Sequence, residues 1–230
     1  ASTASVALEG IVTTMQMQQG YSGIYALPAD AVMVYVPSFS FVEQAFDSWK
    51  QGQSEMRVDY MISAGRDDGE FFNERGDKDC HINQNGEFKL HPGGVRYMMP
   101  TEAYMEYKWR VVEKCLERNP GAIVLEEPET FNLYCYADGF REAWGEYYHE
   151  PFADPALSPE NRYKANKLFA HMWTAFVDEI GQRLKESYPE VEYVIATHSI
   201  SGYGSWDMTS SISDYTKSEY VDGVIAQVWS

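Results

Sequence analysis

Basic residues are scarce in this sequence. Its 230 residues include 18 Lys and Arg against 35 Asp and Glu, which gives a formal net charge of −17. Nucleic-acid binding needs clustered Lys and Arg against phosphates, so the composition argues against that class of partner. An anionic membrane surface is disfavoured for the same electrostatic reason. Most of the acidic excess is expected to form a solvated surface.

Cysteine motifs and long apolar runs are also missing. Cys80, Cys115 and Cys135 lie far apart, and an odd number cannot pair fully within the chain, so we expect structural thiols rather than a disulfide framework. No His, Asp and Cys set has metal-site spacing, and we predict neither a metal nor another cofactor. No run is long enough to span a bilayer, and no signal peptide is recognised, so the location stays open.

Aromatic residues are abundant, at 15% of the chain. Most are expected in the core, but flat amphipathic rings also suit stacked ligands such as sugars. Short apolar runs predict buried strands over 31–36, 58–63, 123–125, 193–198 and 224–229, with a further candidate over 96–99. Helical spacing predicts helices over 6–19, 41–50, 101–118, 140–148 and 159–188. The Gly-, Asp- and Asn-rich stretch 69–94 has no periodic segment and is predicted to be a long loop insertion.

The alternation of strands and helices implies a parallel α/β sheet. We predict one domain over residues 1–230, a parallel (β/α) barrel of the TIM type. The predicted strands are fewer than the eight of a closed barrel. The chain also ends on a strand whose neighbour position is empty, which leaves an apolar edge. We therefore expect an incomplete barrel, completed by the remainder of a longer chain or by another subunit.

Three glutamates, Glu126, Glu127 and Glu129, follow the strand over 123–125. Strand alternation puts Glu127 on the face of Leu125 and Glu126 on the opposite face, while Pro128 turns Glu129 into the next loop. Like charges and burial raise the pKa of at least one carboxyl group. A carboxyl that stays protonated near neutrality can act as a general acid, which glycosidic-bond cleavage requires.

Glu126-Glu127-Pro128 resembles the Asn-Glu-Pro motif at the end of the fourth strand in many retaining glycosidases with a TIM-barrel fold. That resemblance implies an acid/base role for Glu127, with Glu126 in place of an Asn that holds a sugar hydroxyl. In order, the segments 62–67, 125–129, 197–199 and 225–229 resemble a family of longer, glycoside-hydrolase-like barrel proteins. The resemblance implies a carbohydrate substrate or ligand, with Glu126 and Glu129 tuning Glu127 and a second carboxylate on the seventh strand.

Two alternatives remain open. The segments 125–129 and 196–199 are also similar to the Walker B strand and switch histidine of ABC-type ATPases. Those proteins need a Gly-x-x-x-x-Gly-Lys-Ser/Thr loop upstream, and none precedes Glu126. In the second alternative the three glutamates only cap a helix or pair with Arg and take no part in catalysis. A catalytically silent carbohydrate-binding barrel is one form of this alternative.

The remaining candidates are predicted to bind substrate. The carboxyl ends of parallel strands form the ligand face of such folds, and Arg66, Asp67 and His198 lie at strand ends. Arg66 suits paired hydrogen bonds to substrate or to an acid at the rim. Aromatic and amide side chains near the last two strand ends are predicted to form stacking platforms and pocket contacts: Tyr203, Trp206, Gln227 and Trp229.

Overall fold

The computed structural model describes residues 14–17, 31–43, 57–67, 69–75, 77–91, 93–130, 134–198 and 212–227. The strands are β1 (Thr14–Met17), β2 (Ala31–Val36), β3 (Arg57–Ser63), β4 (Arg66–Asp67), β5 (Arg96–Tyr97), β6 (Ala122–Glu126), β7 (Glu192–His198) and β8 (Gly223–Gln227). The helices are α2 (Glu70–Arg75), α3 (Glu102–Leu116), α4 (Asp138–Tyr148), α5 (Pro159–Ser187) and α6 (Ile212–Tyr215).

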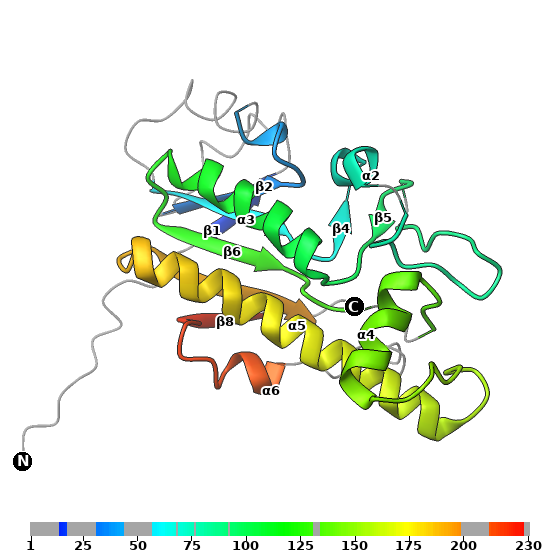
Figure 1. The fold of residues 1–230 in the computed structure, drawn as a ribbon. Coiled ribbons are helices and arrows are strands. Elements are labelled where there is room, and N and C mark those ends of the chain that lie inside the picture. The colour runs from blue at the N-terminus through cyan, green and yellow to red at the C-terminus, as the bar shows by residue number, and fades with distance from the viewer. Residues whose placement is uncertain are drawn as a thin grey trace, which may run out of the picture.

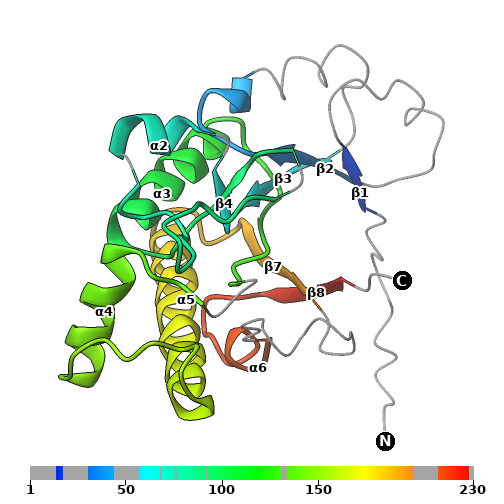
Figure 2. The same cartoon turned by 90° about the vertical axis from the view of Figure 1, so that its right-hand side faces the viewer.

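Six strands form one parallel sheet in the order β1-β2-β3-β6-β7-β8, which is also their order along the chain. Each strand is therefore added beside its predecessor, as in a (β/α) barrel, whereas a doubly wound fold reverses direction at a switch point. Among the described residues β1 and β8 do not pair, so the sheet is open (Figures 1 and 2). The predicted TIM-type barrel, incomplete in this chain, is confirmed.

The sheet buries apolar side chains on both faces. On its outer face, Val34, Ile62 and Leu125 belong to the main core, which also includes the inward sides of α3 and α5. These two helices cover the same side of the sheet in Figure 2. The opposite, inner face carries a second cluster, formed by Met33, Met61, Val124 and Ala196 with Tyr35 and Val194 against it. Burial on two faces explains the continuous apolar runs of the strands.

Each of the two long helices begins at a hydroxyl side chain that caps it. The hydroxyl of Thr101 accepts a hydrogen bond from the Tyr104 N–H at 3.3 Å, and α3 follows. The hydroxyl of Ser158 accepts one from the Asn161 N–H at 3.1 Å, with Pro159 at the first helical position of α5. Such caps satisfy N–H groups that have no partner within the helix.

Two local predictions differ from the structure. The helix expected over 6–19 is wrong where the structure describes it, because Thr14–Met17 form β1, with Thr14 opposite Ala31 of β2. Pairing with an apolar neighbouring strand outweighs a weak local propensity. The stretch 69–94 holds α2 and isolated bridges, and so is more regular than its composition predicted. Of the helix expected over 41–50, only the helical residues 41–43 lie within the described part of the chain.

Candidate functional site

Polar side chains gather where the parallel strands end. Because β1 precedes β2 and β3 in the sheet, β6 is its fourth strand, and it ends at Glu126. Glu126 lies opposite Ser63 of β3 and Ala196 of β7 in the ladder. His198 is the last residue of β7. The ends of three strands thus place these polar residues at one edge of the sheet, where ligand sites lie in parallel α/β folds.

Glu127 leaves β6 in a left-handed conformation, with φ of 52°. This backbone region is unfavourable for residues with a side chain, and it persists only where the surroundings fix it. The Glu127 N–H donates to the carbonyl of Ala196 at 2.7 Å, and the Glu129 N–H donates to the carbonyl of Glu127 at 2.8 Å. The turn ends the strand alternation, so the prediction that Glu127 shares the face of Leu125 is wrong.

Arg66 joins the two adjacent glutamates. Its Nη2 lies 2.7 Å from Glu126 Oε2 and 3.0 Å from Glu127 Oε2. Its Nε donates to Ser63 Oγ at 3.3 Å. The side chains of Arg66, Glu126 and Glu127 are only 12%, 8% and 7% exposed, so this is an almost buried charge cluster. Charges removed from water in this way must be paired.

Buried side chains fix the backbone on both sides of this cluster. The carbonyl of Arg66 accepts hydrogen bonds from the Tyr104 hydroxyl at 2.7 Å and from Lys108 Nζ at 3.2 Å, both on α3. The hydroxyl of Tyr215 donates to the carbonyl of Pro128 at 2.6 Å. The arginine and the loop after β6 are therefore held by the helices packed on the outer face.

His198 lies between two glutamates. Its Nδ1 is 3.1 Å from Glu129 Oε2, and its backbone N–H donates to Glu129 Oε1 at 2.7 Å. The hydroxyl of Thr197 donates to the same oxygen. On the other side of the ring, Nε2 lies 3.6 Å from Glu127 Oε1. Glu129 therefore orients the imidazole so that its second nitrogen faces Glu127.

The ionisation of these groups follows from burial and from their neighbours. Burial raises the pKa of the Glu127 carboxyl; Arg66 and His198 oppose this, and the Glu129 charge adds to it. Burial likewise raises the pKa of Glu126, with Arg66 opposing and the Glu127 charge adding. The hydrogen bond with Glu129 raises the pKa of His198. Both shifts favour the protonated forms of the glutamate and the histidine.

Sequence reasoning missed two tyrosines and a serine at this cluster. Tyr35 precedes the last residue of β2 and is hydrogen-bonded to Ser63; burial and then the Glu126 charge raise the pKa of its hydroxyl. Burial raises the pKa of Tyr97, with Arg66 opposing and Glu127 adding. The strand-end rule that selected His198 would also have selected Tyr35. Tyr97 gave no such signal, because β5 reaches the site only by pairing with β4.

The other predicted residues are placed differently. The buried carboxylate of Asp67 accepts hydrogen bonds from the N–H groups of Gly69, Phe71 and Phe72, at 3.1, 3.1 and 3.0 Å. It therefore caps the start of α2 instead of facing the glutamates. Three predicted aromatic residues, Tyr203, Trp206 and Trp229, lie outside the described residues, and Gln227 is described only as the last residue of β8.

The described residues contain no group of three or more His, Cys, Asp and Glu side chains arranged to hold a metal ion. No helix among them has the length and apolar character needed to cross a membrane.

The chain is similar to solved β-galactosidase structures. It superimposes on a β-galactosidase from the Antarctic haloarchaeon Halorubrum lacusprofundi with a TM-score of 0.63 and 14% identity, covering 95% of this chain and 40% of that one. For a β-galactosidase from the psychrophilic Marinomonas ef1, the TM-score is 0.51 and the identity 13%, covering 72% of this chain and 33% of that one. No protein-family model and no curated protein sequence matches.

These similarities establish the fold alone, since the sequence identities are low. They show a glycoside-hydrolase-like α/β fold for this chain, in agreement with its sheet order. The chain spans less than half the length of either galactosidase.

Proposed function

We propose that this chain is part of a glycoside hydrolase that acts on an oligo- or polysaccharide, with Glu127 as the general acid/base. One observation carries the proposal: the Glu127 carboxyl is nearly buried beyond the end of the fourth strand, between Arg66 and His198. The acid/base glutamate of the resembled retaining glycosidases occupies this strand end. A raised pKa lets Glu127 stay protonated and donate to the oxygen of the scissile glycosidic bond.

The neighbours of Glu127 have supporting roles in this proposal. Glu129 orients His198, whose Nε2 faces the acid/base carboxyl. Glu126 anchors Arg66 and is not the second catalytic carboxylate, because one guanidinium nitrogen lies between it and Glu127, where a sugar would have to sit. Retaining chemistry needs a second carboxyl about 5–5.5 Å away, and inverting chemistry one about 6.5–9.5 Å away. β8 is the sixth strand, so a seventh-strand carboxylate would come from beyond it.

A second candidate function is a carbohydrate-binding barrel without catalysis. The observation in its favour is that Arg66 neutralises both Glu126 and Glu127 at short distance, as in a purely structural ion cluster. An ATPase reading has weaker support, because the sequence before Glu126 holds no phosphate-binding Gly-Lys loop.

The test uses the full-length protein and a panel of aryl glycosides with good and poor leaving groups. We expect Glu127→Gln to lower kcat by about 10²–10⁴-fold on poor leaving groups and by less on good ones, which need no proton to depart. Glu113→Gln, at an exposed position on α3, is the matched control and should leave turnover unchanged. Equal turnover by wild type and Glu127→Gln on poor leaving groups would remove Glu127 from the mechanism.

Two further outcomes separate the alternatives. Oligosaccharide binding with no turnover in the wild type would favour the silent barrel. ATP binding in a calorimetric titration would favour the ATPase, and the glycosidase proposal requires that it be absent.

A further inference from the structure

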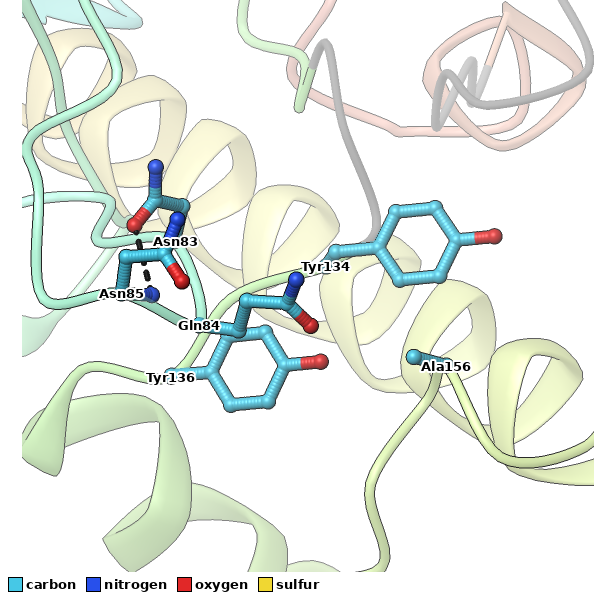
Figure 3. A pocket seen from close by; sticks show the side chains of 6 residues that line it. All are labelled: Asn83, Gln84, Asn85, Tyr134, Tyr136 and Ala156. Carbon is cyan, nitrogen blue, oxygen red and sulfur yellow. Dashed lines mark hydrogen bonds between the residues drawn. The ribbon is translucent and has the colours of Figure 1, made fainter.

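A pocket outside the charge cluster is lined by neutral side chains, most of which are polar. Its volume is about 400 Å³, within the roughly 300–1,000 Å³ of small-molecule sites. The described residues that line it are uncharged (Figure 3): Asn83, Gln84, Asn85, Tyr134, Tyr136 and Ala156. In a chain with a net charge of −17, such a neutral lining is distinctive.

A fixed turn presents the amide side chains. Asn83 Oδ1 accepts hydrogen bonds from the N–H groups of Asn85 and Glu87, at 2.9 and 3.0 Å, and Asn83 Nδ2 donates to Glu87 Oε2 at 2.9 Å. Asn83 is thus occupied in shaping the turn, while the exposed residues Gln84 and Asn85 stand at its tip. A side-chain amide carries both hydrogen-bond donors and an acceptor. It can therefore pair with a sugar hydroxyl, which also donates and accepts hydrogen bonds.

The two tyrosines of the lining are also held in place. The Tyr136 hydroxyl donates to Asp154 Oδ1 at 2.6 Å, and its ring packs edge-on against Phe152. The Tyr134 hydroxyl accepts from Arg162 Nη1 at 3.1 Å. Rings fixed in this way offer an apolar surface with little entropy lost on binding.

The pocket and the charge cluster are connected. Tyr134 and Tyr136 belong to the connection that leaves β6 through Glu127 and leads to α4. The Tyr136 N–H donates to the carbonyl of Ile82 at 2.8 Å, which ties this connection to the turn over 83–85. Figure 1 shows that β6 points toward the side of the molecule that carries α4 and the segment around β5. The pocket therefore lies on the side of the strand ends.

We propose that this pocket is a binding subsite for a neutral oligosaccharide, which holds sugar units away from the scissile bond; this inference rests on the proposed function. The substrate class is then an uncharged glycan of several units. Carboxylated sugars are disfavoured, because the described lining residues are all uncharged and the chain carries a large negative charge.

The test is calorimetric titration of the full-length protein with neutral gluco-, manno- and galacto-oligosaccharides, and with oligogalacturonide as an anionic probe. The double variant Gln84→Ala with Asn85→Ala alters exposed side chains only. We expect it to weaken binding of a neutral oligosaccharide by about tenfold or more, since two hydrogen-bonding groups are removed. Gln182→Ala is the matched control, an exposed amide near the other end of α5, about 30 Å along the helix from Arg162.

The outcomes separate the two proposals. The subsite would be overturned if the double variant left the affinity for every neutral oligosaccharide unchanged. It would also be overturned if the wild type bound oligogalacturonide more tightly than the neutral oligosaccharides. Binding that depends on Gln84 and Asn85 in a protein without turnover supports the subsite and removes the hydrolase. If turnover depends on Glu127 and the double variant has no effect on long neutral substrates, the hydrolase is supported and the subsite is overturned.

Discussion

Gly65 lies directly against the backbone of Glu127. A methyl group at its α-carbon would come within 2.9 Å of the Glu127 carbonyl oxygen and within 3.3 Å of the Glu129 carbonyl oxygen. Both neighbours are backbone atoms, which cannot move aside as a flexible side chain can. The absence of a side chain at residue 65 is therefore what lets the end of β3 approach the left-handed turn at Glu127.

Gly65→Ala should destabilise the fold by about 1–3 kcal/mol, the usual cost of overpacking. Chemical denaturation measures this change. Gly145→Ala is the control: residue 145 lies inside α4, and the added methyl meets nothing closer than 4.0 Å. That substitution should stabilise the protein by up to about 1 kcal/mol, because Ala favours a helix over Gly. Equal effects of the two variants would contradict the close packing at Gly65.

Arg66→Met should destabilise the protein most at neutral and alkaline pH. It leaves the buried carboxylates of Glu126 and Glu127 without their counter-charge, an effect of about 3–5 kcal/mol for a broken buried pair. The folded-state pKa of both carboxyls would rise further above the unfolded value. A carboxyl group whose pKa is raised by folding stabilises the folded state at pH values below its unfolded-state pKa. This stabilisation is lost as the pH rises through its folded-state pKa.

The deficit of Arg66→Met should therefore shrink as the pH falls from about 8 to about 4, as followed by urea denaturation. Arg110→Met provides the comparison. Arg110 forms an exposed pair with Glu74, and such pairs contribute about 0–1 kcal/mol. A deficit of Arg66→Met that stays constant over this range would show that the carboxyl groups are not responsible.

His198→Gln should give a stability loss that is largest in mildly acidic solution. Glu129 raises the folded-state pKa of His198, so the stabilisation is fully present below the unfolded value of about 6.5 and is lost as the pH rises through the folded pKa. Unfolding of wild type and variant at about pH 6 and about pH 9 measures the difference. Equal losses at the two pH values would mean that the imidazolium–carboxylate pair does not contribute.

Lys108→Met should cost more than its loss of charge suggests. The fully buried Lys108 donates to the carbonyls of Pro37 and Arg66, both at 3.2 Å, and losing it leaves these carbonyls without that donor. We expect about 1–3 kcal/mol of destabilisation, measured by denaturation. Lys114→Met on the same helix removes solvent-screened ion pairs and should change stability less than Lys108→Met does. A smaller loss of stability for Lys108→Met than for Lys114→Met would contradict a stabilising role for the Lys108 hydrogen bonds.

Local patterns in the amino-acid sequence were enough to predict the parallel α/β fold, the core strands and the long helices. Apolar runs and helical spacing are local signals, and they placed β2, β3, β6, β7, α3 and α5 within a few residues. The strand-end rule also selected Glu126, Glu127, Glu129, Arg66 and His198. These residues meet in the structure because parallel strands present their carboxyl ends at one edge.

The tertiary structure, by contrast, sets how those residues lie relative to one another. It made Thr14–Met17 a strand through pairing with β2, and so made β6 the fourth strand. It turned the Glu127 carboxyl toward His198, which strand alternation cannot predict because a single left-handed residue reverses it. In it, Asp67 accepts hydrogen bonds at the start of α2, and Tyr35 lies close enough to Glu126 for that charge to raise its pKa. Each of these depends on contacts between residues distant in sequence, for which periodicity carries no signal.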